Sequence, residues 1–216
     1  MKKEIKTNIE KTDMKKLLEL CTKNVHFTFQ NEIYQQTDGV AKGSPLGPVH
    51  SNIFMVNLEK SIIPSLLENM TPWKRYVDDT IAYIKPESIN MVLSKLNSFH
   101  ENIEFTYEIE NQKQLPFLDV MIIREGDNSL TTTVYRKDTN NDCYLNWNSY
   151  APNTWKRGTV KTLVERAIMI CSNEIILNKE LQYIENQLIR KNGYPKWIVD
   201  NVMHDIPDKE HASNTN

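Results

Sequence analysis

The chain has 216 residues, which fits one large domain or a domain with a small appendage. Charged residues make up 25 % of it and hydrophobic residues 39 %, and these values exclude a disordered, highly charged chain. The 26 basic and 28 acidic residues give a net charge of −2, so the chain as a whole is not a polycation. A nucleic-acid-binding surface would therefore have to be local.

The cysteines and the apolar runs argue against two further classes of protein. Cys21, Cys143 and Cys171 are widely spaced and form no CxxC pair, which disfavours a disulfide framework or a zinc site. This use of cysteine favours a reducing, intracellular compartment. The longest apolar runs, such as IFMV and VMII, are far too short to span a bilayer, so we expect no membrane partner.

The N-terminal part predicts a helix, a hairpin, a loop and a second helix. Apolar residues at positions 14, 17, 18 and 21 share one face of the first helix. The aromatic-rich stretch HFTFQNEIYQQ predicts a hairpin that turns at QNE. TDGVAKGSPLGP, residues 37–48, holds three glycines and two prolines and predicts a loop. The next helix runs until Pro64 disturbs it, and we expect its inward residues to be Ile53, Phe54, Leu58 and Ile62.

The middle of the chain predicts a hairpin, a helix and three strands. KRYVDDTIAYIK, residues 74–85, reads as a hairpin with Asp78 and Asp79 at its turn. Pro86 fits the first turn of the helix that follows. IEFTYEIE alternates apolar and polar residues as a half-buried strand does, which places Phe105 and Tyr107 in the core. LPFLDVMII and SLTTTVYRK predict two further strands with a turn at EGDN between them.

Beyond Thr139 the pattern predicts helices alone. Thr159 and Asn178 are the expected N-caps of two helices, Gly193 the stop of the second, and Pro195 the start of a short last one. Residues 151–196 contain eight Lys or Arg and four Glu, a local excess of positive charge. Strands and helices that alternate and then give way to helices predict an α+β domain with a helical appendage.

Two motifs have an ordinary and a functional interpretation. Taken alone, Asp78 and Asp79 are most simply a polar turn, because aspartate is favoured there. A carboxylate at a hairpin tip is also suited to Mg²⁺, which proteins hold with few ligands plus substrate phosphates. The glycine-rich loop is by itself a surface loop, or else a backbone that approaches a nucleotide or template base closely. The basic helices are either a solvated face or a phosphate-binding surface.

In combination, the order of the motifs resembles the later palm of a reverse transcriptase, and most closely that of Penelope-like retroelements. The residues that match motif B of that family are Tyr34, Gln36, Gly39, Gly43, Ser44, Pro45, Leu46, Pro48 and Asn52, and those that match motif C are Arg75, Tyr76, Val77, Asp78 and Asp79. FTYEIE, LPFLDV, VYRKDT and NGYP continue the likeness, which covers about residues 14–200. Lys42, Gly47, Ser51 and Asp138 depart from the family pattern.

The resemblance implies a right-hand-polymerase palm, an antiparallel sheet with packed helices, over residues 1–138. A thumb-like helical region would follow over residues 139–204 and a polar tail over 205–216. The implied catalytic and metal-binding residues are Asp78 and Asp79, with Mg²⁺ or Mn²⁺ as the cofactor. The other implied roles are nucleotide or template binding for Gln36, Gly39, Gly43, Ser44, Pro45 and Tyr76, a place near the primer for Phe117, Leu118 and Asp119, and backbone binding for Lys156, Arg157 and Lys161.

The same resemblance implies an RNA template, a DNA primer and dNTPs as partners, and a nuclear location. It also implies a first catalytic aspartate upstream of motif B, together with fingers, and this chain shows neither. Asp13 lies at the start of an amphipathic helix and not in an apolar strand, so it is no substitute. We therefore expect an RNA-directed DNA polymerase fragment that is inactive alone. The alternatives are a non-catalytic nucleic-acid-binding remnant and an inert truncated element copy.

Overall fold

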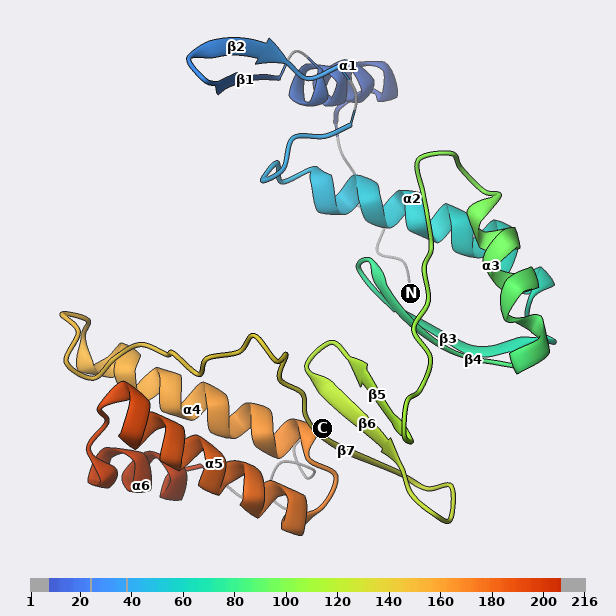
Figure 1. Cartoon of the computed structure of the whole chain (residues 1–216). Coiled ribbons are helices and arrows are strands. Elements are labelled where there is room, and N and C mark those ends of the chain that lie inside the picture. The colour runs from blue at the N-terminus through green and yellow to red at the C-terminus, as the bar shows by residue number, and fades with distance from the viewer. Residues whose placement is uncertain (1–7, 24, 38, 207–216) are drawn as a thin grey trace. The chain divides into compact units, whose positions relative to one another are not determined.

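The computed structural model describes residues 8–23, 25–37 and 39–206. The chain divides into two compact units, Met1–Thr106 and Tyr107–Asn216, and each is described by itself (Figure 1). Both contain helices and small antiparallel sheets, so the predicted α+β class is confirmed at this level. None of the helices in the described part is long and apolar enough to cross a membrane.

The first unit begins with the predicted helix and hairpin. Helix α1 spans Lys11–Thr22, and strands β1 (His26–Phe29) and β2 (Glu32–Gln35) pair in antiparallel register. Gln30 and Asn31 form the two-residue turn, and both have a positive φ, as turns that match the strand twist require. No residue of α1 is buried, and every residue of both strands is exposed. The apolar stripe of α1 is therefore correctly placed on a helix but does not form a core.

Helix α2 (Gly47–Ile62) continues into a 3₁₀ turn, η1 (Ile63–Ser65), at Pro64. Leu58 and Ile62 are buried as expected, whereas Ile53 is 64 % exposed, so its predicted inward position is wrong. The reason is that the buried residues of α2 lie in its C-terminal half, where they meet the rest of the core of this unit.

The core of the first unit is built by α2, η1 and the elements that follow. Strands β3 (Met70–Tyr76) and β4 (Asp79–Ile84) form the predicted hairpin, and η2 (Pro86–Ser88) leads into α3 (Ile89–Asn97). The buried members of this cluster are Leu58, Ile62, Leu66, Met70, Val92 and Leu96.

The predicted strand at residues 103–110 does not form. The side-chain amide of Asn97 accepts a hydrogen bond from the Phe105 N–H at 2.6 Å and donates one to its carbonyl at 3.1 Å. Both backbone groups of Phe105 are therefore occupied by a side chain and not by a neighbouring strand. Phe105 packs against the core, but Tyr107 is 54 % exposed, so its predicted place in the core is wrong.

The second unit opens with a three-stranded sheet, β5 (Gln114–Phe117), β6 (Val120–Arg124) and β7 (Leu130–Val134). The prediction of LPFLDVMII as one strand is wrong, because Leu118 takes a φ of 54° and the chain reverses there, pairing Phe117 with Val120. The predicted EGDN turn does separate β6 from β7.

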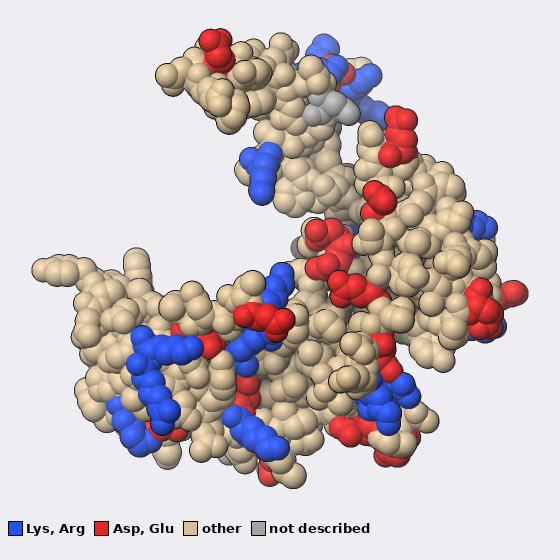
Figure 2. Space-filling model, viewed as in Figure 1, with Lys and Arg blue, Asp and Glu red and all other residues tan. Residues whose placement is uncertain are grey.

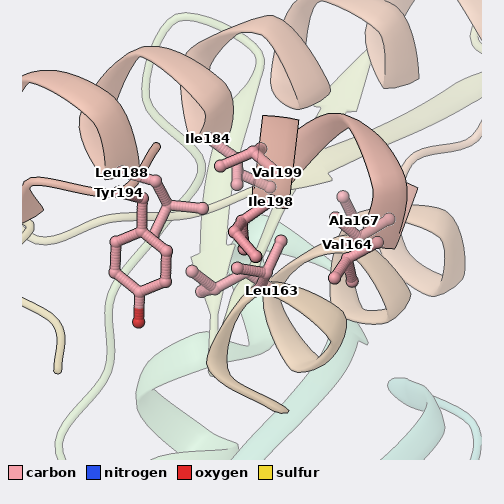
Figure 3. Close-up of a cluster of buried hydrophobic side chains, with 10 residues drawn as sticks. Leu163, Val164, Ala167, Ile184, Leu188, Tyr194, Ile198 and Val199 are labelled. Carbon is pink, nitrogen blue, oxygen red and sulfur yellow. The ribbon is translucent and has the colours of Figure 1, made fainter. Parts of the chain in front are cut away.

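Three helices complete this unit: α4 (Asn153–Ile170), α5 (Glu174–Asn192) and α6 (Lys196–His204). Their apolar faces enclose one cluster around Leu163, Ile184 and Val199 (Figure 3). Gly193, in the left-handed region at φ 71°, ends α5, and Pro195 precedes α6, as predicted.

The predicted N-caps of α4 and α5 are wrong. Thr159 lies inside α4, where its hydroxyl donates to the Trp155 carbonyl at 3.2 Å. The N-cap of α5 is Asn173, whose side chain accepts from the Ile176 N–H at 2.9 Å, and Asn178 is a later, exposed residue of the same helix. The N-caps of α4 and α5, Pro152 and Asn173, lie seven and five residues before the predicted ones.

The sheet of the second unit packs on its helices. Thr132 on β7 donates from its hydroxyl to the Ile170 carbonyl at 2.5 Å, and its carbonyl accepts from the Ser172 N–H at 3.1 Å. The sheet and the helices accordingly belong to one compact unit, whose boundary at Thr106–Tyr107 lies upstream of the division expected at 138/139. That expected division concerns palm and thumb and stays a prediction; most of the proposed tail, from residue 207 on, lies outside the described residues.

Candidate functional site

The hairpin of β3 and β4 presents the two adjacent aspartates. Its turn consists of Val77 and Asp78, and Val77 has a φ of 56°. Asp79 is not in the turn but is the first residue of β4, directly opposite Tyr76. Both carboxylates and Tyr76 are exposed, so the pair is available to a ligand from outside the chain.

Arg75 ties this turn to helix α2. Its Nε donates to Glu59 Oε1 at 2.6 Å, and its guanidinium also donates to Asn52 Oδ1 at 3.1 Å and to the Val77 carbonyl at 2.9 Å. The Arg75 and Glu59 side chains are only 10 % and 23 % exposed. Arg75 and Asn52 belong to the two motifs that the resemblance singled out, and the fold brings them into direct contact. One guanidinium thus fixes the backbone beside Asp78.

Glu59 is held as a carboxylate at this position. Partial burial acts to raise its pKa, but hydrogen bonds from Arg75 and from the Trp73 indole, with the charge of Arg75, outweigh it. The pKa of Glu59 is therefore lowered from its usual range. An ionised Glu59 keeps the Arg75 guanidinium charge-paired and directed at the turn.

The carboxylates of the hairpin supply only part of the ligands that a pair of metal ions requires. Within residues 8–23, 25–37 and 39–206 no three His, Cys, Asp or Glu side chains come together as metal ligands. Asp78 and Asp79 are sequence neighbours, one in a turn and one in a strand, and two-metal catalysis needs carboxylates that bridge both ions. These residues alone therefore do not fit a complete two-metal centre.

The motif B residues lie in the loop between β2 and α2. Gly39 and Gly43 have φ of 78° and 91°, so the left-handed backbone there favours glycine. Ser44 Oγ accepts from the Leu46 N–H at 3.3 Å, and the Ser44 carbonyl accepts from the Gly47 N–H at 3.0 Å. These bonds shape the start of α2. Gln36, partly buried, and Pro45, exposed, lie in the same loop.

The residues expected near a primer form the β5–β6 turn in the second unit. Phe117 is partly buried, whereas Leu118 and Asp119 are exposed. Asp119 Oδ2 lies 3.3 Å from Arg166 Nε, an ion pair that joins the turn to α4. Asp119 therefore has a structural partner within its own unit.

The basic trio on α4 divides into one buried and two accessible residues. Lys156 is 6 % exposed, its Nζ donates to the Ser149 carbonyl at 2.8 Å, and it lies 5.2 Å from the Trp147 ring centroid. Its predicted contact with a nucleic-acid backbone does not fit this placement. Arg157 is partly buried and Lys161 is exposed beside Glu165, so both can reach a phosphate. Figure 2 shows Lys and Arg side chains gathered over the helices of this unit.

Sequence reasoning missed a buried polar network beside α5. Arg136 makes a bidentate pair with Glu180, which is 6 % exposed, and lies 4.3 Å from the ring centroid of Tyr183. The Tyr183 hydroxyl donates to Asp142 Oδ2 at 2.5 Å, and burial, followed by this bond to Asp142, raises the pKa of Tyr183 to about 12. Asp138 and Asp142 look alike in sequence, so no local pattern marks the second as buried.

The connection between α5 and α6 has the length expected of a helix-turn-helix. Three residues, Gly193, Tyr194 and Pro195, connect the helices, a length and composition typical of that motif. Residues 143–204 match the family model of the animal helix-turn-helix domain. The matched segment covers all three helices of the second unit and less than half of the chain. No curated protein and no solved structure matches the chain.

Proposed function

We propose that this chain binds nucleic acid through the helices of its second unit. The observation that carries the proposal is the match of residues 143–204 to a helix-turn-helix family, a motif that places helices against DNA. The local excess of positive charge over residues 151–196 supports it, because backbone phosphates are bound by Lys and Arg.

We further propose that residues 1–138 derive from the palm of an RNA-directed DNA polymerase like those of Penelope-like retroelements. In support, Arg75 joins Asn52 and Glu59 to the turn that presents Asp78, which couples the two motifs of the resemblance. In that family Asp78 would hold Mg²⁺ or Mn²⁺ with Asp79 beside it, and the RNA template, DNA primer and dNTPs would be the partners. The palm over 1–138, the thumb over 139–204 and a nuclear location belong to the same proposal.

Because the described residues do not make a complete metal centre, we propose that the isolated chain binds without polymerising. Primer extension on a poly-rA template with Mg²⁺ or Mn²⁺ is expected to yield no product. Clear incorporation that Asp78→Ala abolishes would contradict this part of the proposal and leave nucleic-acid binding intact.

Binding is tested by titrating labelled duplexes at several salt concentrations. We expect the logarithm of the binding constant to fall linearly with the logarithm of the salt concentration. The slope should correspond to several neutralised phosphates. Arg157→Gln with Lys161→Gln is expected to reduce that slope by about 2, because each of the two cations neutralises one phosphate. Lys85→Gln, a substitution of an exposed lysine in the first unit, is the matched control. Undetectable binding at low salt would overturn the proposal.

A further inference from the structure

One end of the helical unit combines exposed aromatic rings with arginine side chains. The start of α4, the end of α5 and the start of α6 meet there (Figure 1). We call this the aromatic end and define it by Tyr150, Trp155, Arg157, Arg190 and Trp197.

Tyr194 holds the three segments together. It is buried, and its hydroxyl lies 2.8 Å from the Leu145 carbonyl and 3.3 Å from the Lys156 carbonyl, as donor. Its ring lies 5.5 Å from the ring of Trp147, and the backbone N–H of Trp147 donates to the Asn192 carbonyl at 2.9 Å. The backbone that carries the exposed rings is therefore rigidly placed by buried contacts.

The aromatic rings of this end are not part of the core. Trp155 is 67 % and Trp197 60 % exposed, and Tyr150 is fully exposed. The neighbouring Trp147 and Tyr194 already fill the interior, so packing does not explain why three more large rings lie nearby. An exposed aromatic ring offers a flat apolar surface on which an unpaired base can stack.

The charges of this end suit a polyanion. Arg157 and Arg190 form no ion pair with any residue that the structure describes. Lys196 pairs with both Glu185 and Asp200, which leaves one net negative charge in that group, and Asp142 lies inside the buried network. Two arginines at the same end of the unit as the three rings therefore remain available for phosphates.

We propose that the aromatic end binds single-stranded nucleic acid, with bases stacked on Trp155 and Trp197 and phosphates on Arg157 and Arg190. Paired bases are already stacked within a duplex and cannot use these rings, so the chemistry favours a single strand over a helix. The proposal rests on the nucleic-acid binding proposed above and adds its substrate class.

The test compares single-stranded and duplex oligonucleotides of about 12 nucleotides, within the site sizes known for stacking proteins. Fluorescein-labelled oligo-dT, oligo-rU and a mixed duplex are titrated with the full chain and followed by anisotropy. We expect tighter binding to the single strands, and quenching of tryptophan fluorescence by them alone.

The variant pair Trp155→Ala with Trp197→Ala is expected to weaken single-strand binding at least tenfold and to leave duplex binding unchanged. Trp155→Phe with Trp197→Phe keeps a ring and is expected to recover most of it. Met169→Ala with Ile175→Ala is the matched control, because both side chains are more than 70 % exposed at the other end of α4 and α5. Tyr150→Ala, at a fully exposed position, should not disturb folding, and it is expected to weaken single-strand binding in the same test.

Equal binding of single strand and duplex, or wild-type single-strand affinity in the tryptophan variants, would overturn this inference alone. Failure of the wild-type chain to bind either kind of probe would overturn the proposed function as well.

Discussion

The two compact units bury their apolar side chains to very different degrees. In the second unit ten buried residues from three helices and the α5–α6 turn form one cluster, whereas the first unit has six. The N-terminal helix and hairpin of the first unit contribute none of those six. An amphipathic stripe therefore predicts a helix but not a core, because burial also needs an opposing surface. We expect most of the stability of the chain to reside in residues 107–206.

Leu188→Ala should have the largest effect, because it opens a cavity in the better-packed unit. Leu188 is fully buried, and we expect a decrease of about 4 kcal/mol in the free energy of unfolding. Urea denaturation followed by circular dichroism measures it. Leu20→Ala on α1, where the side chain is 76 % exposed, should change stability by no more than about 0.5 kcal/mol. Similar decreases in both variants would contradict the conclusion that residues 107–206 carry most of the stability.

Glu180→Gln should come next, because it removes the bidentate carboxylate partner of Arg136 and leaves the guanidinium only the Asp142 carboxylate, 3.7 Å away. We expect a decrease of about 2 kcal/mol in the free energy of unfolding, because charged hydrogen bonds within the second unit are lost. The control is Glu185→Gln, which removes an exposed pair with Lys196 and should cost less than about 1 kcal/mol. An effect of Glu180→Gln no larger than that of the control would show that the network adds no stability.

Tyr183 should make the second unit sensitive to alkaline pH. Its pKa is about 12 in the folded chain and near 10 in the unfolded chain, so unfolding releases its proton between these values. Stability is therefore complete below about pH 10 and falls as the pH rises toward 12. Thermal melts over this range, with ultraviolet titration of the tyrosinates, measure the effect. Tyr183→Phe should remove the late-titrating tyrosine and cost about 1 kcal/mol at neutral pH.

Glu59 should give the smallest effect and confine it to the first unit. Its folded pKa is lowered, so its contribution is present above its unfolded pKa, near 4.5, and is lost as the pH falls through the folded value. We expect this contribution to the free energy of unfolding to be about 1 kcal/mol. Carbon NMR of the Glu59 carboxylate should follow its titration directly. In Glu59→Gln that acid-dependent step should disappear, while the second unit unfolds as before; an unchanged acid response would refute the role of the Arg75 contact.

Local patterns predicted the elements of the fold better than their ends. The hairpin at residues 70–84, the stop at Gly193 and the start at Pro195 follow from residue types with strong backbone preferences. The strand expected at 103–110 failed because Asn97 occupies both backbone groups of Phe105, a contact that alternation cannot reveal. LPFLDVMII failed because Leu118 adopts a left-handed backbone conformation that its residue type does not favour.

The candidate site could be predicted in its residue types but not in its partners. Asp78 was correctly placed at the hairpin tip, whereas the contact of Arg75 with Asn52 and Glu59 joins residues 16 to 23 positions apart. Lys156 was assigned to a phosphate surface because charge alone does not show that its stem and ammonium are enclosed by Trp147 and Ser149. The exposure of Trp155 and Trp197 could not be predicted, since a sequence does not tell which aromatic residues remain open to solvent.

The side chain of Asn192 determines how late in synthesis an earlier segment of the chain can reach its folded contacts. Its amide donates to the Asp142 carbonyl at 2.9 Å and accepts from the Tyr144 N–H at 2.7 Å, so it closes a segment made about 50 residues earlier. A chain emerging from the ribosome therefore carries residues 142–144 without their partner until the whole of α5 has been translated. During that interval the Asp142 carbonyl and the Tyr144 N–H are accessible to a chaperone or a protease. In the finished protein both groups are bonded to Asn192.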